Sequence, residues 1–113
     1  LVEVNGAAYA EMQNNARGTK ANCILAKSED VTDYIEPDQT VILDPPRAGC
    51  DEKLIAALNT TKPDRIIYLS CNPITQARDI ALLAENYIIT ELRPYNFFPR
   101  TPHIESLAIL KRR

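Results

Sequence analysis

Three short segments of this chain carry side chains that could act chemically on a bound molecule. The segments are Asp44-Pro45-Pro46-Arg47-Ala48-Gly49, Ser70-Cys71-Asn72-Pro73 and Phe98-Pro99-Arg100-Thr101-Pro102-His103-Ile104-Glu105. Each follows or leads into an apolar run typical of a β-strand. In open α/β sheets, ligands bind outside the carboxyl ends of the strands, so we expect Asp44, Cys71 and Glu105 to lie at one sheet edge. A nucleophilic thiol beside a candidate base indicates covalent catalysis rather than simple binding.

Apolar runs and breaker residues predict the elements that must position these side chains. Strands are expected at residues 1–4, 23–26, 40–43, 65–69, 87–93 and 106–110. Helices are expected at residues 7–17, 51–58 and 73–85, and a further helix is expected to follow the capping residues 28–30. Pro45 must end the third strand because proline cannot donate to a β-ladder. Asn72 can cap the last helix, with Pro73 at its first position.

The order of these elements predicts an α/β domain with a mostly parallel sheet. No helix separates the last two strands, so we expect that pair to be antiparallel. Two sets of apolar residues share a helix face: Leu54, Ile55 and Leu58, expected to point inward, and Ile74, Ala77 and Ala81, expected on one side of the next helix.

Size and charge limit the classes of protein to which the chain can belong. With 113 residues it is one small domain at most. Its formal net charge of −2 argues against a generic nucleic-acid binder. That charge is compatible with a catalytic domain whose RNA is gripped by another part of a longer protein. Because the chain opens at Leu1, inside a predicted strand, we expect it to be a fragment of such a protein.

The cysteines and the apolar runs bear on the cellular compartment. Cys23, Cys50 and Cys71 form no C-x-x-C pair, and the single His103 offers no set of metal ligands. Free thiols in a reducing cytoplasm are therefore expected. No apolar run is long enough to span a bilayer, so we expect no membrane partner.

Together and in this order, the three segments resemble those of the RNA 5-methyluridine (uracil-C5) methyltransferases. The resemblance extends over essentially all 113 residues. It implies an S-adenosylmethionine-dependent enzyme that methylates C5 of a uridine in transfer or ribosomal RNA. The implied fold is a Rossmann-like sheet with a final antiparallel hairpin. The resemblance also implies that residues 1–113 match only the C-terminal portion of the catalytic domain, without its first strand and its glycine-rich cofactor loop.

The resemblance gives Cys71 and Glu105 catalytic roles. A thiolate that adds to C6 of uracil makes C5 nucleophilic enough to accept a methyl group. Cys71 lies just before a helix N-terminus, where the dipole favours a thiolate. Glu105 would then remove the C5 proton as general base. Without the surrounding motifs, an inert buried cysteine and a surface glutamate are the alternative interpretations.

The same resemblance places S-adenosylmethionine near three carboxylates. Glu3 ends the first predicted strand, where an acidic residue accepts hydrogen bonds from ribose hydroxyls. Asp30 matches a polar residue near the adenine, although Ser28 and Glu29 compete for that position. Asp44 would lie beside the cofactor or the uracil ring, near the transferred methyl group.

Two arginines are candidates for binding the substrate. Arg47 could pair with a carboxylate of the site or with RNA phosphate. Arg100 could shape the uridine pocket or meet phosphate, and His103 is either its partner there or a structural histidine.

Other interpretations of the chain stay open. A fragment without the cofactor loop could be catalytically silent, and its exposed strand edges would favour self-association. A different S-adenosylmethionine-dependent methyltransferase could use the Asp-Pro-Pro turn to hold an amino group. Such enzymes usually place an aromatic residue where this chain has Arg47, and they need no cysteine. A pure RNA-binding protein is disfavoured by the mild acidity and the lack of a basic stripe.

Overall fold

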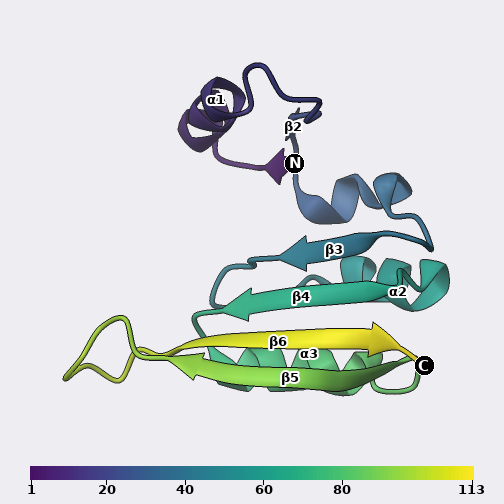
Figure 1. The fold of residues 1–113 in the computed structure, drawn as a ribbon, viewed down its shortest axis with the longest axis vertical. Coiled ribbons are helices and arrows are strands. Elements are labelled where there is room, and N and C mark those ends of the chain that lie inside the picture. Colours follow the sequence, from purple (N-terminus) through teal and green to yellow (C-terminus); the bar gives the residue numbers. More distant parts are fainter. The chain divides into compact units, whose positions relative to one another are not determined.

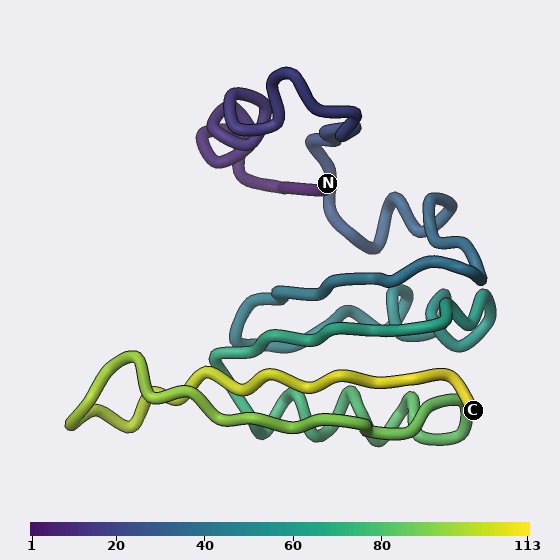
Figure 2. Tube along the Cα trace, in the orientation of Figure 1, coloured from purple at the N-terminus to yellow at the C-terminus, as the bar shows by residue number.

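The chain forms two compact units, Leu1–Tyr34 and Ile35–Arg113, in the computed structural model, which describes residues 1–113. Figure 1 labels the helices and strands, and Figure 2 follows the path of the chain. Both units combine strands with helices, which confirms the predicted α/β class. None of the helices is long and apolar enough to cross a lipid bilayer.

The first unit is a β-α-β segment followed by two single helical turns. Its elements are β1 (Val2–Glu3), α1 (Gly6–Asn15), β2 (Ile24–Leu25), η1 (Ser28–Asp30) and η2 (Thr32–Tyr34). The two strands pair in parallel, with Glu3 opposite Leu25. The side chain of Asn5 caps α1 by accepting hydrogen bonds from the backbone N–H groups of Ala7 and Ala8.

The helix predicted to follow the capping chemistry of residues 28–30 does not form, and two 3-10 turns take its place. Lys27, rather than Ser28, occupies the N-cap position of η1, and it makes no side-chain capping bond. At Val31 the backbone leaves the helical region, with φ −128° and ψ 29°. Val31 and Thr32 are β-branched and therefore poor at prolonging a helix. The first turn consequently ends after three residues.

The second unit is a four-stranded sheet with two helices. Its elements are β3 (Thr40–Leu43), α2 (Glu52–Thr61), β4 (Arg65–Ser70), α3 (Pro73–Leu83), β5 (Tyr87–Tyr95) and β6 (Glu105–Arg112). The strand order is β3-β4-β6-β5. β3 and β4 are parallel, whereas β6 is antiparallel to both of its neighbours. The predicted antiparallel pairing of the last two strands is confirmed.

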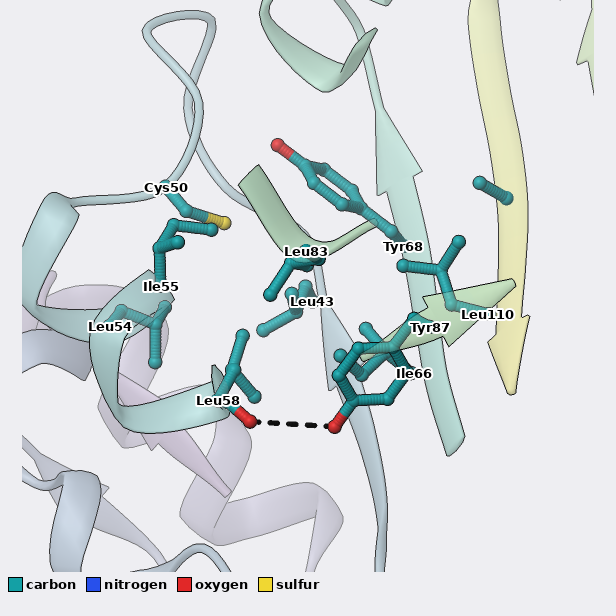
Figure 3. Close-up of a cluster of buried hydrophobic side chains, with 11 residues drawn as sticks. Leu43, Cys50, Leu54, Ile55, Leu58, Ile66, Tyr68, Leu83, Tyr87 and Leu110 are labelled. Atoms are coloured by element: carbon teal, nitrogen blue, oxygen red, sulfur yellow. Dashed lines mark hydrogen bonds between the residues drawn. The ribbon is translucent and has the colours of Figure 1, made fainter. Parts of the chain in front are cut away.

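The hydrophobic core of this unit lies between the sheet and the helices α2 and α3, which cover the same sheet face (Figures 1 and 3). The cluster consists of Leu43, Cys50, Leu54, Ile55, Leu58, Ile66, Tyr68, Leu83, Tyr87, Ala108 and Leu110. The inward direction predicted for the three apolar residues of α2 is confirmed. Side chains on this face alternate along β4 and β6 with less buried ones on the other face.

The buried face of α3 is partly polar. Ile74, Ala77 and Ala81 do share one side of this helix, but that side is exposed, and Ile74 is 81% exposed. The residues that α3 buries are Gln76, Asp79 and Leu83. A helix can bury polar side chains only where they find hydrogen-bond partners. The surface against which α3 packs must therefore supply such partners.

Candidate functional site

The second unit places the three candidate residues at one edge of its sheet. Asp44 directly follows β3, Cys71 directly follows β4, and Glu105 is the first residue of β6. The parallel register pairs Leu43 with Tyr68, so β3 and β4 end at nearly the same level. β6 runs in the opposite direction, and its first residues therefore lie where β4 ends. The topology thus brings two carboxylates and one thiol to the same end of the sheet.

The register brings Cys71 next to Glu105. The ladder between β4 and β6 ends at the pair Ser70 and Ser106, so Cys71 and Glu105 are the residues next to that last pair. Ser70 and Ser106 are buried toward the helices, while Cys71 and Glu105 are both partly exposed. By the alternation of a β-strand, Glu105 belongs to the sheet face that the helices leave open, and Cys71 lies in the bend just beyond the end of β4. A partly exposed thiol and a partly exposed carboxylate therefore lie at the same end of two neighbouring strands.

Cys71 is held in a tight bend between two polar residues. Ser70 Oγ donates to Asn72 O at 3.0 Å and accepts from Asn72 N at 3.0 Å. Asn72 Oδ1 accepts from Ile74 N at 3.2 Å and so caps α3, with Pro73 in its first turn. The predicted cap and helix start are confirmed. These contacts fix the backbone on both sides of the thiol.

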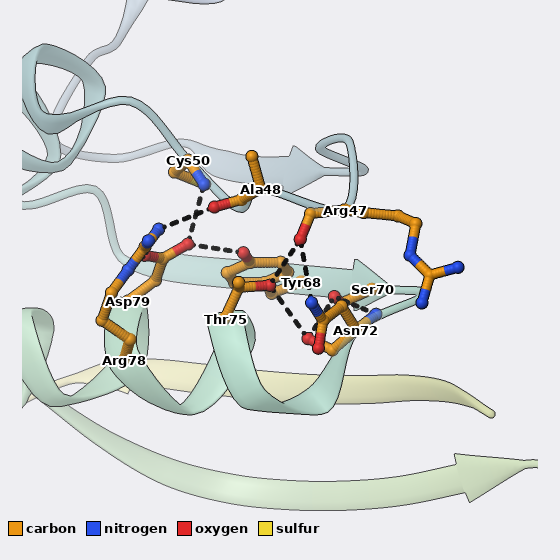
Figure 4. Close-up of polar contacts among 9 residues, drawn as sticks. All are labelled: Arg47, Ala48, Cys50, Tyr68, Ser70, Asn72, Thr75, Arg78 and Asp79. Carbon is orange, nitrogen blue, oxygen red and sulfur yellow. Dashed lines mark hydrogen bonds and ion pairs between the residues drawn. The ribbon is translucent and has the colours of Figure 1, made fainter. Parts of the chain in front are cut away.

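The loop after β3 is attached to α3 by side chains of that helix and its cap (Figure 4). Asn72 Nδ2 donates to the carbonyl oxygen of Arg47 at 3.0 Å, and Thr75 Oγ1 approaches the same oxygen at 3.1 Å. Arg78 Nη2 donates to Ala48 O at 3.0 Å. The loop that begins with Asp44 is thereby joined to the helix that begins after Cys71.

A buried carboxylate completes this attachment. Asp79 Oδ2 accepts hydrogen bonds from Cys50 N and from the Tyr68 hydroxyl, both at 2.7 Å. Asp79 Oδ1 accepts from Arg78 Nε at 2.9 Å and Nη2 at 2.7 Å. Burial, followed by the hydrogen bond to Asp79, raises the pKa of Tyr68 far above its usual value, so its hydroxyl remains a donor. Asp79 thus ties the loop, β4 and α3 together.

Gln76 connects the two strands that carry the thiol and the second carboxylate. It is buried, and its Nε2 donates to Tyr68 O at 2.9 Å and to Ser106 O at 3.0 Å. These two carbonyls belong to β4 and β6, just inside the edge that carries Cys71 and Glu105. Gln76 and Asp79 are not among the site residues predicted from the sequence. Their spacing with Leu83, at three and seven residues, is a helical repeat that could have revealed them.

The two cysteines of this unit have different surroundings. Cys50 is buried, and this burial raises its pKa to about 11, so it stays a neutral thiol at neutral pH. Cys71 is free and partly exposed. Because the thiolate is the reactive form of cysteine, Cys50 is suited to packing. Cys71 is the cysteine of this unit that a ligand can reach.

Gly49 allows the loop to approach this cluster closely. Its φ is +84°, and a Cβ atom there would lie 2.6 Å from both Arg78 Nη2 and Asp79 Oδ2. We expect Gly49→Ala to lower the free energy of unfolding by about 1–3 kcal/mol through backbone strain alone, and further through the clash. Gly18→Ala is the matched control, since Gly18 has φ +80° but open space around its Cβ position. Equal losses for the two variants in urea unfolding would contradict the proposed close approach.

The other predicted site residues are placed as follows. Glu3 and Asp30 belong to the first unit, at the end of β1 and in η1, and Glu3 Oε1 accepts from Asn5 N at 2.7 Å. Arg47 is exposed and contributes its carbonyl to the contacts with α3. Arg100 is exposed in the loop between β5 and β6 and has φ +65°. Asp44, Cys71 and Glu105 lie at the same end of the sheet of the second unit, and their roles there stay predictions.

Comparison with known proteins adds a family context to this geometry. A family model described as tRNA (uracil-5-)-methyltransferase matches residues 8–113. An uncharacterized RNA methyltransferase of Staphylococcus aureus strain COL is 44% identical, over 96% of this chain and 25% of its own length. One of Staphylococcus epidermidis strain ATCC 12228 is 42% identical, over 99% of this chain and 26% of its own length. The chain thus spans about a quarter of these relatives.

Solved structures share the fold. The chain is similar to the Pyrococcus abyssi tRNA (uracil-54, C5)-methyltransferase, solved in complex with S-adenosyl-L-homocysteine, with a TM-score of 0.78 and 36% identity. That match covers 96% of this chain and 27% of the other. A SAM-dependent methyltransferase of Leishmania major matches with a TM-score of 0.72 at 9% identity, which indicates a common fold. The Rossmann-like methyltransferase fold is therefore confirmed.

Proposed function

The chain belongs to the tRNA (uracil-5-)-methyltransferase family, and from that premise we propose that it is the C-terminal portion of a catalytic domain that methylates C5 of a uridine in transfer or ribosomal RNA. The observation that carries this proposal is the pairing of β4 with β6, which ends at Ser70 and Ser106 and so puts Cys71 and Glu105 next in sequence at the same end of two neighbouring strands. The chain spans about a quarter of its curated relatives, so the activity is assigned to the longer protein.

Cys71 is the proposed nucleophile. C5 of uracil is a weak nucleophile because the C4 carbonyl withdraws electrons from the C5–C6 double bond. Addition of the Cys71 thiolate to C6 forms a C–S bond and shifts the electrons of the C5–C6 double bond toward C5 and the C4 carbonyl. C5 then has enough electron density to accept a methyl group. The bend between Ser70 and Asn72 would hold the sulfur in position for this addition.

Glu105 is the proposed base that completes the reaction. After methyl transfer, C5 carries both the new methyl group and its original hydrogen. A carboxylate removes that proton, and the electrons of the C–H bond restore the C5–C6 double bond. The same shift expels the Cys71 thiolate from C6. The location of Glu105 next to the end of β4, which Cys71 follows, suits this role.

S-adenosylmethionine is the proposed cofactor, and when bound it supplies an electrophilic methyl group. Glu3 lies at the carboxyl end of a strand in a parallel pair, where carboxylate oxygens accept hydrogen bonds from ribose hydroxyls. Asp30 follows the neighbouring strand, and Asp44 is exposed at the end of β3. We assign Glu3 and Asp30 to the adenosyl part of the cofactor and Asp44 to the group next to the uracil.

RNA is the proposed partner, and the exposed arginines are candidates for its phosphates. Arg47 and Arg100 both stand in loops at the sheet edge that carries Cys71 and Glu105. Guanidinium groups bind phosphate with paired hydrogen bonds. The weak overall charge of this chain means that most of the RNA affinity would come from other parts of the longer protein.

A trapping experiment tests the nucleophile and the reaction class together. The full-length protein is incubated with S-adenosylmethionine and RNA that contains 5-fluorouridine. Fluorine cannot leave C5 as a proton, so we expect the protein to remain covalently attached to the RNA as a denaturation-resistant band. Cys71→Ala should abolish this band.

The matched control is Cys23→Ala, which removes a partly exposed thiol of the first unit and should leave the band intact. A band that persists in Cys71→Ala would exclude Cys71 as the nucleophile. The absence of any band with a folded protein that binds the cofactor would refute the covalent mechanism.

A further inference from the structure

The end of β5 and the loop that follows it carry a stacked aromatic pair that the catalytic proposal does not use. The rings of Tyr95 and Phe97 are stacked, with centroids 5.6 Å apart and planes inclined by 8°. Tyr95 is partly buried, whereas Phe97 is 63% exposed. One ring thus supports the other, and the outer ring is largely open to solvent. A large exposed aromatic residue held in a fixed orientation is a typical contact for a flat partner.

This pair continues the row of site residues across the sheet. The ladder pairs Tyr95 with Glu105, and Glu105 lies next to the end of β4, which Cys71 follows. Cross-strand partners point to the same sheet face, so Tyr95 shares the open face with Glu105. Phe97 follows Tyr95 by two residues, in the loop that projects beyond the ends of β3 and β4 (Figure 1). The aromatic pair therefore borders the place where the uracil would be held.

The chemistry around the pair favours RNA as its partner. The segment 92–104 contains two arginines and one histidine but no acidic residue. Arg93 pairs with Glu91, which leaves Arg100 as the exposed guanidinium of the loop. Thr101 Oγ1 donates to Phe98 O at 2.7 Å and closes a turn next to the rings. A flat ring beside a cation matches the two parts of a nucleotide, its base and its phosphate.

We propose that Phe97, supported by Tyr95, forms a stacking platform for an unpaired RNA base next to the target uridine. This inference rests on the proposed function, because it takes RNA as the substrate. An enzyme that acts on a base must remove that base from its stack, which deprives the neighbouring base of a stacking partner. The Phe97 ring replaces that partner. Every base has a flat face, so the platform contributes affinity with little sequence preference.

Fluorescence of a stacked base analogue tests the platform in the full-length protein. Substrate RNAs carry 2-aminopurine, whose emission is quenched on stacking, at one position on either side of the target uridine. We expect quenching at one of these positions on binding. Phe97→Ala should remove the quenching and weaken RNA binding about tenfold, while turnover at saturating RNA stays within a few-fold of the unaltered enzyme. Phe97→Tyr should retain both the quenching and the affinity.

Leu92→Ala is the matched control, because Leu92 is an exposed apolar residue on β5 that is 57% exposed and pairs with Ala108, on the other sheet face. It should leave quenching and affinity unchanged. The 5-fluorouridine adduct, measured at saturating RNA, separates the two proposals. An adduct together with unchanged quenching and affinity in Phe97→Ala would refute the platform and leave the methyltransferase proposal intact. Loss of turnover with unchanged RNA affinity would also refute it, since Phe97 would then support the active site only structurally.

Discussion

Replacing Glu105 by glutamine in the full-length protein should halt the reaction after methyl transfer and leave ordinary RNA covalently attached to Cys71. The amide has nearly the shape of the carboxylate but cannot take the proton from C5. Without that proton transfer the thiolate cannot leave C6. General bases typically contribute about 10²–10⁴-fold to rate, so turnover should fall by that order. The measurement is a denaturing gel of the protein after incubation with uridine-containing RNA and S-adenosylmethionine labelled in its methyl group.

The label distinguishes this result from simple inactivation. A trapped intermediate carries both the RNA and the labelled methyl group, whereas a protein that has lost its fold carries neither. The double variant Cys71→Ala/Glu105→Gln should lose the band. Glu91→Gln is the matched control, because Glu91 is a partly exposed carboxylate of β5 that pairs with Arg93, and it should turn over normally. Normal turnover by Glu105→Gln would mean that another group removes the proton.

The sheet edge of the site follows from local sequence signals. β3 ends where Pro45 and Pro46 forbid further pairing, and α3 begins where Asn72 and Pro73 provide a cap and a first helical position. Such signals depend only on adjacent residues, so the strand ends and helix starts that they predict do not depend on tertiary contacts. The placement of Cys71 beside Glu105 then follows from strand order and direction. Their chemical roles stay predictions.

The polar contacts beneath the site could not be predicted in the same way. Hydrophobic periodicity picks out the apolar side of α3, with Ile74 and Ala77, yet that side is exposed. Gln76 and Asp79 can be buried because their side chains form hydrogen bonds with backbone groups. Gln76 donates to the carbonyl oxygens of Tyr68 and Ser106, and Asp79 accepts from the N–H group of Cys50. These partners come from distant parts of the chain. A buried polar face is favourable only in that tertiary setting.

In the first unit, the sequence predicts a helix that the structure does not contain. Residues 28–30 carry helix-capping side chains, but the helix does not continue past Val31. Capping residues stabilise a helix that other residues can extend, and they do not by themselves supply the extension. The capping residues 28–30 therefore do not predict a full helix here, because β-branched residues follow them directly and Pro37 comes soon after.

Asp79→Ala should strongly destabilise the second unit, lowering the free energy of unfolding by about 3–5 kcal/mol. The change leaves Cys50 N and the Tyr68 hydroxyl buried without an acceptor, and an unsatisfied buried donor costs about 1–3 kcal/mol. It also removes the carboxylate that Arg78 contacts. Since domains are stable by only about 5–15 kcal/mol, much of the chain's margin would be lost. Urea unfolding, followed by circular dichroism, measures the change.

Another Asp–Arg pair of the same unit separates burial from charge. Asp64 pairs with Arg112, but its side chain is 52% exposed, whereas that of Asp79 is 1% exposed. Water can replace the lost partner at an exposed site, so Asp64→Ala should cost less than about 1 kcal/mol. Asp79→Asn, which keeps an acceptor oxygen but loses the charge, should fall between the two. If Asp79→Ala cost no more than Asp64→Ala, the loop would have to be held near Cys71 by Asn72, Thr75 and Arg78 alone. In that case the 5-fluorouridine adduct should form as readily in Asp79→Ala as in the unaltered protein.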